Sequence, residues 1–105
     1  MSKNKRPPAD LPVVTVAGDL DASNLGPLDA QLKAAADGAP GVILDISAVT
    51  FGDSTFLNLL IRTHRTTDLR IAGLHPPVDR LFHLVGVDTV LKIFPTVADA
   101  RSTRA

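Results

Sequence analysis

The sequence predicts an α/β fold, with one domain built on a mainly parallel sheet. Short runs rich in β-branched residues alternate with longer stretches in which apolar residues recur every three or four positions. These are the periods of strands and of amphipathic helices. A helix is predicted after each strand, and that order favours parallel pairing. The length of 105 residues suits a single domain.

The first strand and the first helix are predicted within residues 12–37. Residues 12–17 are rich in valine and threonine, which favour strands. Ser23 is a suitable N-cap for a helix that continues to about Asp37, and Gly38 is expected to end it. Four apolar residues would form the buried face of this helix: Leu25, Leu28, Leu32 and Ala35.

The middle of the chain carries the clearest pattern. The apolar run at residues 41–46 predicts a buried second strand. A turn is expected next, and a second helix is predicted from about Ser54 to Thr66, with Leu57, Leu60 and Ile61 on one face. Residues 68–72 predict a short third strand.

The last third of the chain predicts one more strand between two helices. Residues 73–77 contain a glycine and two prolines, which are typical of a loop. Pro77 can begin a third helix, and Gly86 is expected to end it. Residues 90–94 predict a fourth strand, and Thr96 is expected to cap a short final helix.

The predicted domain covers residues 11–101. Residues 1–10 and 102–105 are expected to be tails. The N-terminal tail carries three basic residues, which are few for a nucleic-acid-binding arm.

Composition argues against several classes of function. Lys and Arg (11) balance Asp and Glu (11), so no dedicated surface for nucleic acid or for an anionic membrane is expected. Cysteine, tryptophan and tyrosine are absent, which excludes disulfides, thiolate chemistry and cysteine zinc sites and argues against base-stacking platforms. No apolar run approaches the ~20 residues that span a bilayer. No signal peptide is recognised, so the cytoplasm is the expected location.

Acidic residues follow two of the predicted strands. Asp19 and Asp21 come after the first strand, and Asp53 comes before the second helix, next to Ser54. Sites in parallel α/β sheets lie beyond the carboxyl ends of the strands. If the first two strands are neighbours, the two acidic loops therefore meet on one face.

The hydroxyl of Ser54 can have either of two roles at this junction. As a helix N-cap it would accept a free backbone N–H, which is worth roughly 1 kcal/mol. As a phosphorylation site it would place negative charge where the helix dipole favours it by roughly 0.3–1 kcal/mol. The carboxylates of Asp19, Asp21 and Asp53 would oppose that charge. Phosphorylation is therefore expected to change the surface and leave the fold intact.

Three segments together resemble a known family. Residues 16–21 read Val-Ala-Gly-Asp-Leu-Asp, and residues 44–57 contain Asp-Ile-Ser and then Asp-Ser-Thr. Residues 77–86 contain Val-Asp-Arg-Leu-Phe and a closing glycine. Their order and spacing resemble the STAS family, named for sulfate transporters and anti-sigma factor antagonists, and most of all its small free-standing anti-anti-sigma factors. The resemblance covers about residues 11–101.

The resemblance implies a small mixed, mainly parallel four-stranded sheet with its helices packed on one side. It also implies partner switching. The unphosphorylated protein would bind an anti-sigma factor that is also a serine kinase, and so free a sigma factor for transcription. Phosphorylation of Ser54 would end the binding, and a serine phosphatase would restore it. The partner-contacting residues implied in this way are Asp19, Asp21, Asp53, Ser54, Thr55, Phe56 and Asn58.

In this reading the chain is a substrate and not an enzyme. It would need no cofactor and no metal, and it would contact neither nucleic acid nor membrane directly. A monomer or a weak dimer is expected.

Two positions depart from the family pattern. Phe56 stands where the family usually has glycine, and Gly52 stands where a larger apolar residue is common. A phenylalanine there either buries its ring or presents an apolar contact to a partner. The alternative function is a non-switching STAS-type interaction module, such as a stress-complex subunit or a transport accessory protein, whose serine is not phosphorylated.

Other chemistry finds little support in the sequence. No G-x-S-x-G elbow and no glycine-rich nucleotide motif is present. The spacing of His64, His75 and His83 matches no close pair of metal ligands. The arginines at 62, 65 and 70 are interpreted as a solvated face, with a rim that pairs with an acidic partner as the alternative.

Overall fold

The computed structural model describes residues 11–102, so the predicted N-terminal tail and residues 103–105 lie outside the described residues. The elements in chain order are β1 (Val13–Leu20), α1 (Gly26–Ala36), β2 (Gly41–Gly52), α2 (Ser54–Thr66), β3 (Asp68–Ala72), α3 (Val78–Val85), the 3-10 helix η1 (Val87–Thr89), β4 (Lys92–Phe94) and α4 (Val97–Ser102). No helix among them is long and apolar enough to cross a membrane.

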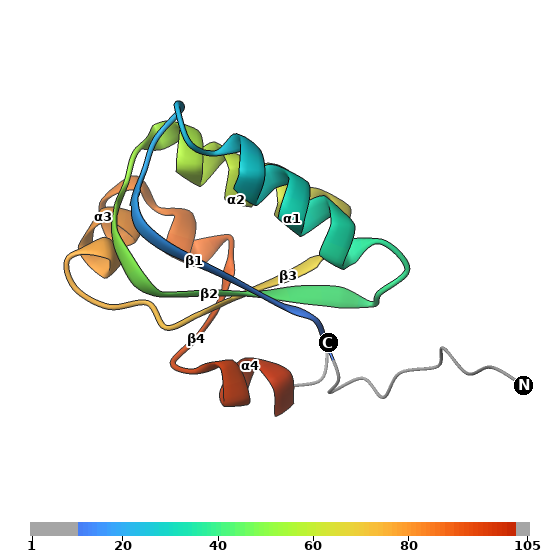
Figure 1. The fold of residues 1–105 in the computed structure, drawn as a ribbon. Coiled ribbons are helices and arrows are strands. Elements are labelled where there is room, and N and C mark those ends of the chain that lie inside the picture. Colours follow the sequence, from blue (N-terminus) through green and yellow to red (C-terminus); the bar gives the residue numbers. More distant parts are fainter. Residues whose placement is uncertain (1–10, 103–105) are drawn as a thin grey trace, which may run out of the picture.

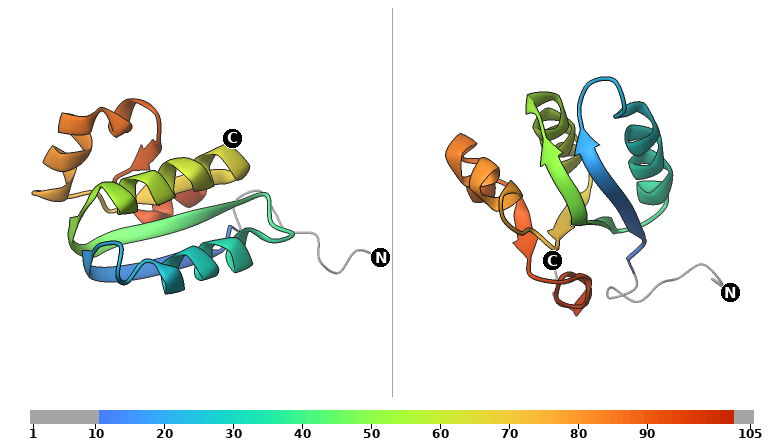
Figure 2. Two further views of the ribbon diagram at one scale, coloured as in Figure 1. Left: turned by 90° about the horizontal axis from the view of Figure 1, so that it is seen from above. Right: turned by 60° about the vertical axis from the view of Figure 1, so that its left-hand side comes forward.

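The strands form one sheet in the order β1-β2-β3-β4, and every neighbouring pair is parallel. The predicted α/β class and the four-stranded sheet are confirmed. Helices α1, α2 and α3 pack on one side of the sheet, as expected, whereas α4 packs on the opposite side (Figures 1 and 2). The sheet therefore has a large covered face and a smaller one.

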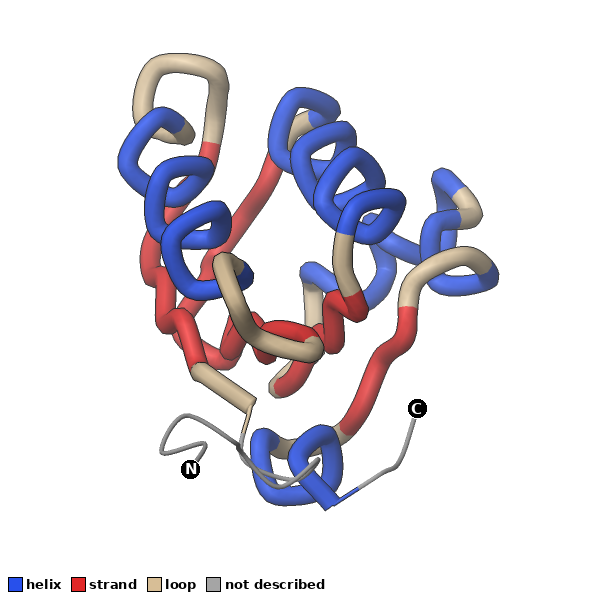
Figure 3. The backbone as a smooth tube through the Cα atoms, turned by 90° about the vertical axis from the view of Figure 1, so that its right-hand side faces the viewer, coloured by secondary structure: helices blue, strands red, loops and turns tan. Residues whose placement is uncertain are grey.

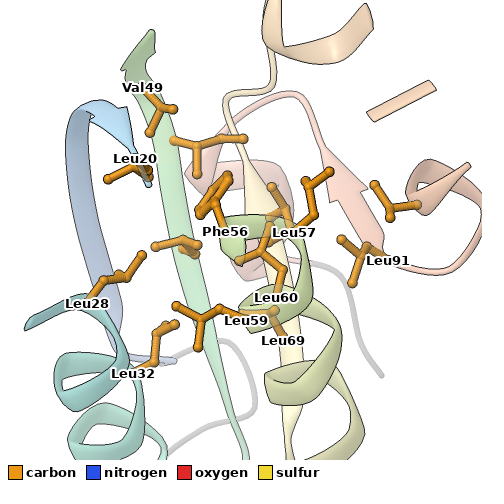
Figure 4. Packing of buried hydrophobic residues seen from close by; sticks show 14 of the residues in the cluster. Leu20, Leu28, Leu32, Val49, Phe56, Leu57, Leu59, Leu60, Leu69 and Leu91 are labelled. Carbon is orange, nitrogen blue, oxygen red and sulfur yellow. The ribbon is translucent and has the colours of Figure 1, made fainter. Parts of the chain in front are cut away.

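The main core lies between the sheet and helices α1 to α3 (Figure 4). Side chains at alternate positions of the strands, among them Val42, Leu44 and Ile46 of β2, point into it and are wholly buried. Helix α2 contributes Phe56, Leu57, Leu59 and Leu60. Each fully buried side chain of this size stabilises the fold by roughly 1.5–3 kcal/mol.

Strand β2 is longer than predicted, because it continues from Ile46 to Gly52 where a turn was expected. The pairing of β1 with β2 shifts register twice, so that β2 contains one extra residue at each place. Buried positions in this half of β2 are consequently spaced by three residues, at Ile46, Val49 and Gly52. A bulged strand of this kind loses the alternation by which strands are recognised in a sequence.

Two other expected boundaries are wrong. Ser23 does not cap α1, because the helix begins only at Gly26, with no side-chain cap, and Ser23 lies in the turn before it, where its hydroxyl and N–H donate to the carboxylate of Asp21. The fourth strand is limited to Lys92–Phe94, since the chain before it forms η1. The expected Thr96 cap is present, where its hydroxyl accepts the N–H of Asp99 at 3.0 Å.

The second face of the sheet is closed by α4 and a buried cation. Arg70 is 3% exposed, so it is not part of a solvated arginine face as the sequence suggested. Its guanidinium donates to the carboxylate of Asp68 at 3.0 Å and to the carbonyl of Ala100 in α4 at 2.5 Å. Lys92 also donates to Asp68, at 2.7 Å. Helix α4 is thus held to β3 by a hydrogen-bonded charge as well as by apolar contact.

Candidate functional site

The two acidic loops meet at the carboxyl ends of β1 and β2. Asp19 pairs with Phe51 and Leu20 with Gly52, and the N–H of Asp53 donates to the carbonyl of Leu20 at 3.1 Å. The expectation that these loops share one face is confirmed, because β1 and β2 are neighbouring parallel strands. We call Asp19, Asp21, Asp53 and Ser54 the acidic edge.

The loop after β1 is folded by its own polar side chains. Asn24 accepts the N–H of Asp21 at 2.9 Å and donates to the carbonyl of Asp19 at 2.8 Å. Asp21 accepts from both polar groups of Ser23, as described above. The hydroxyl of Thr50 donates to Asp19 across the second register shift. Sequence analysis missed Asn24 and Thr50, although an asparagine three residues after an aspartate is typical of an ordered turn.

Asp53, and not Ser54, is the N-cap of α2. Its carboxylate accepts the N–H groups of Thr55 at 3.0 Å and Phe56 at 3.2 Å, together with the hydroxyl of Thr55. The pKa of the Asp53 carboxyl is lowered, above all by the hydroxyl of Thr55. The backbone N–H groups of Phe56, Thr55 and Ala22 add to the effect, which partial desolvation opposes. The reading of Ser54 as a plain helix cap is therefore wrong.

Ser54 occupies the first position of α2 and is exposed. Within residues 11–102 its hydroxyl has no hydrogen-bond partner, whereas the neighbouring Thr55 is half-buried and its hydroxyl is engaged by Asp53. Asn58 is also exposed and lies one turn further along the same face of α2. Ser54 is thus the accessible hydroxyl of this junction.

Phe56 is wholly buried, so the expectation that it contacts a partner is wrong for this structure. Its ring lies over Gly52, where an added Cβ would stand 2.3 Å from the ring carbon Cδ2. The two departures from the family pattern therefore compensate each other, because the absence of a side chain at Gly52 leaves room for the ring of Phe56.

Phe51 was missed by sequence analysis. It lies one residue before the end of β2, opposite Asp19, and is 52% exposed. Aromatic residues are enriched at protein interfaces, which makes this exposed ring a candidate partner contact. The register shift hides it in the sequence, where the same position reads as part of an apolar turn.

The histidines within residues 11–102 form no candidate metal site. His83 contacts Asp88 at 3.1 Å, and no group of three or more His, Cys, Asp or Glu side chains within residues 11–102 could hold a metal ion. The arrangement at the acidic edge offers an accessible hydroxyl, a patch of negative charge and one aromatic contact, which together suit recognition by another protein.

These features define a small parallel α/β interaction domain with an exposed serine at a strand-to-helix junction. A family model described as the STAS domain matches residues 2–100, and the chain belongs to this family. The fold is also similar to the crystal structure of an anti-sigma factor antagonist from Mycobacterium paratuberculosis, with a TM-score of 0.76 and 30% sequence identity. That match covers 84% of this chain and 80% of the other. The family expected from the three sequence segments is confirmed.

Proposed function

We propose that this protein is an anti-sigma factor antagonist whose acidic edge binds an anti-sigma factor while Ser54 is unmodified. Phosphorylation of Ser54 by that partner, acting as a serine kinase, ends the binding, and a serine phosphatase restores it. The observation that carries the proposal is the exposed hydroxyl of Ser54, which has no hydrogen-bond partner within residues 11–102. The similarity to an anti-sigma factor antagonist supports it.

The cap of α2 explains why a phosphate here acts on a partner and not on the fold. A helix N-terminus normally attracts a phosphate through its free N–H groups. Here the carboxylate of Asp53 already accepts the N–H groups of Thr55 and Phe56. A phosphate on Ser54 would gain little from those groups and would lie beside a fixed negative charge. The added charge is therefore presented to the partner.

The burial of Phe56 removes an obstacle to this role. A glycine at that position would leave the start of α2 open to close approach. Because the ring of Phe56 turns inward over Gly52, the surface beside Ser54 stays equally open. The contact surface then consists of Asp19, Asp21, Asp53, Thr55 and Asn58 around Ser54, with Phe51 as an aromatic contact.

In this cycle the chain is a substrate and carries no catalysis of its own. It works in the cytoplasm as a monomer or a weak dimer, and it affects transcription only by sequestering the anti-sigma factor and so releasing a sigma factor. Nucleic acid and membrane take no part in its contacts.

The test combines phosphate mapping with binding measurements. Protein purified from its native cells is analysed by mass spectrometry, and partners captured on the unmodified chain are assayed with ATP for phosphorylation of Ser54. Ser54→Ala is expected to abolish the modification and to keep binding. Ser54→Asp is expected to weaken binding about tenfold or more, because the added charge and bulk no longer fit a partner surface that is complementary to the unmodified serine.

The matched control is Ser102→Asp, which adds the same charge to an exposed serine at the end of α4, on the other side of the sheet. It should bind like the unaltered chain, and both aspartate variants should keep a native circular dichroism spectrum. Undiminished binding by Ser54→Asp, with no phosphate found on Ser54, would establish the alternative of a non-switching STAS module.

A further inference from the structure

A second surface of the molecule has the opposite charge. A groove of about 360 Å³ lies between α1 and the C-terminal half of α2, away from Ser54. Figure 3 shows these helices side by side above the same side of the sheet. The groove is lined by Asp29, Leu32, Lys33, Arg62, Thr63, Arg65 and Thr66. Its volume falls within the range of small-molecule sites in proteins.

The interior of the groove is mainly apolar. Leu32 forms part of its floor and is only 1% exposed, so the floor lies below the charged rim. The two threonines need no polar partner in the groove, because the hydroxyl of Thr63 donates to Leu59 at 2.8 Å and that of Thr66 to Thr63 at 3.0 Å. Lysine and arginine side chains line such a groove with their aliphatic stems and keep their charged ends at the rim.

The rim has more positive than negative charge. Lys33 contacts Asp29 at 3.4 Å, so the one carboxylate of the groove already has a cation beside it. Arg62 and Arg65 are exposed, and within residues 11–102 neither guanidinium has an ion pair or a hydrogen bond. Guanidinium groups bind carboxylates through paired, charge-assisted hydrogen bonds. The groove thus combines an apolar floor with unpaired donors for an anion.

These features select one kind of occupant. The unpaired guanidinium groups favour an anionic occupant, and the apolar lining and limited volume favour a small hydrocarbon part. The chain's own N-terminal residues are a poor occupant, because Lys3, Lys5 and Arg6 repeat the charge of the rim. We propose that this groove binds a small single-chain organic carboxylate, with its apolar chain along the aliphatic side-chain parts that line the groove and its carboxylate between Arg62 and Arg65. This proposal is independent of the role of Ser54.

The test is a titration of the full, isotope-labelled chain with octanoate, followed by amide NMR. Saturable shifts are expected for residues of the groove, such as Lys33, Thr63 and Thr66, and not for the acidic edge. The double variant Arg62→Gln with Arg65→Gln should weaken octanoate binding at least about tenfold, since it removes the charge-assisted hydrogen bonds. Arg101→Gln is the matched control, because this exposed arginine lies on α4.

Two probes separate the parts of the proposal. Acetate has the charge without the chain, and 1-octanol has the chain without the charge, so each should bind at least about tenfold more weakly than octanoate. Binding of either probe as tightly as octanoate would overturn the proposal, and so would an absence of saturable shifts. Equal binding by the folded double variant would show that these arginines do not hold the carboxylate, which would also overturn the proposal.

Discussion

Phe51 and Phe56 stand on either side of the Asp53-Ser54 junction, and their rings lie in opposite environments. Phe51, next to the last residue of β2, has half of its surface exposed, whereas Phe56 in the first turn of α2 exposes none. Sequence analysis selected the buried one as the partner contact and overlooked the exposed one. Phe56 can be buried because Gly52 has no side chain and so leaves space for its ring.

The largest expected effect comes from breaking the contact between Gly52 and Phe56. Phe56→Ala should lower the free energy of unfolding by roughly 3–5 kcal/mol, because it leaves a cavity in the core. Gly52→Leu should lower it by roughly 1–3 kcal/mol, because the new side chain collides with the ring. Urea denaturation of the two single variants and of the double variant measures the coupling.

The double variant is the decisive member of this series. A leucine at 52 can refill the space that alanine leaves at 56, so the two losses should partly cancel, with a coupling energy of roughly 0.5–3 kcal/mol. Simple addition of the two losses would mean that the ring does not depend on the absence of a side chain at Gly52.

Phe51→Ala should affect partner binding more than the stability of the fold. Its ring is half exposed, so the free energy of unfolding should fall by less than about 1 kcal/mol. Binding of the anti-sigma factor should nevertheless weaken about tenfold, because exposed aromatic residues often carry much of the energy of an interface. Calorimetric titration of the partner checks this expectation, and unchanged affinity would remove Phe51 from the contact surface.

The smallest expected effect on stability concerns Asp53, which lies between the two phenylalanines in the sequence. The pKa of its carboxyl in the folded protein is below the unfolded value, so its contribution to stability is present above the unfolded pKa and is lost as the pH falls through the folded one. Asp53→Asn keeps a capping oxygen and removes the charge. The variant should melt no more than a few degrees lower at neutral pH.

Thermal melts at several pH values check this sign. The difference in melting temperature between the unaltered chain and Asp53→Asn should disappear in acid, where the residue at position 53 is uncharged in both proteins. Asp53→Ala, which removes the cap as well, should still melt lower there. A difference in melting temperature that grows as the pH falls would contradict the assigned direction of the pKa shift.

Regular elements were predictable from the sequence, and irregular ones were not. The bounds of α2 and β3 agree with their patterns, because an unbroken apolar period specifies each element. The second half of β2 was lost because its bulges replace alternation by a spacing of three. The Ser23 cap failed for a local reason, since the residues around Ser23 form a hydrogen-bonded turn and α1 begins only at Gly26.

The acidic edge was likewise predictable in part from the sequence. Its existence follows from parallel pairing of the first two strands, and Asp19, Asp21, Asp53 and Ser54 were found in this way. Its details depend on contacts between residues distant in the sequence, such as that of Thr50 with Asp19, which no local pattern reveals. Likewise the net charge of zero gave no indication that Arg62 and Arg65 form a basic rim at the other end of α2.

The order of the strands in the sheet, which is also their order in the chain, has a consequence for synthesis of the protein. Each strand that leaves the ribosome pairs with the strand made just before it, so the sheet can grow at one edge without waiting for a distant segment. The acidic edge depends only on elements up to α2 and can take shape early. The helix that seals the second face of the sheet is translated last, and with it Arg70 gains the carbonyl of Ala100 as its partner.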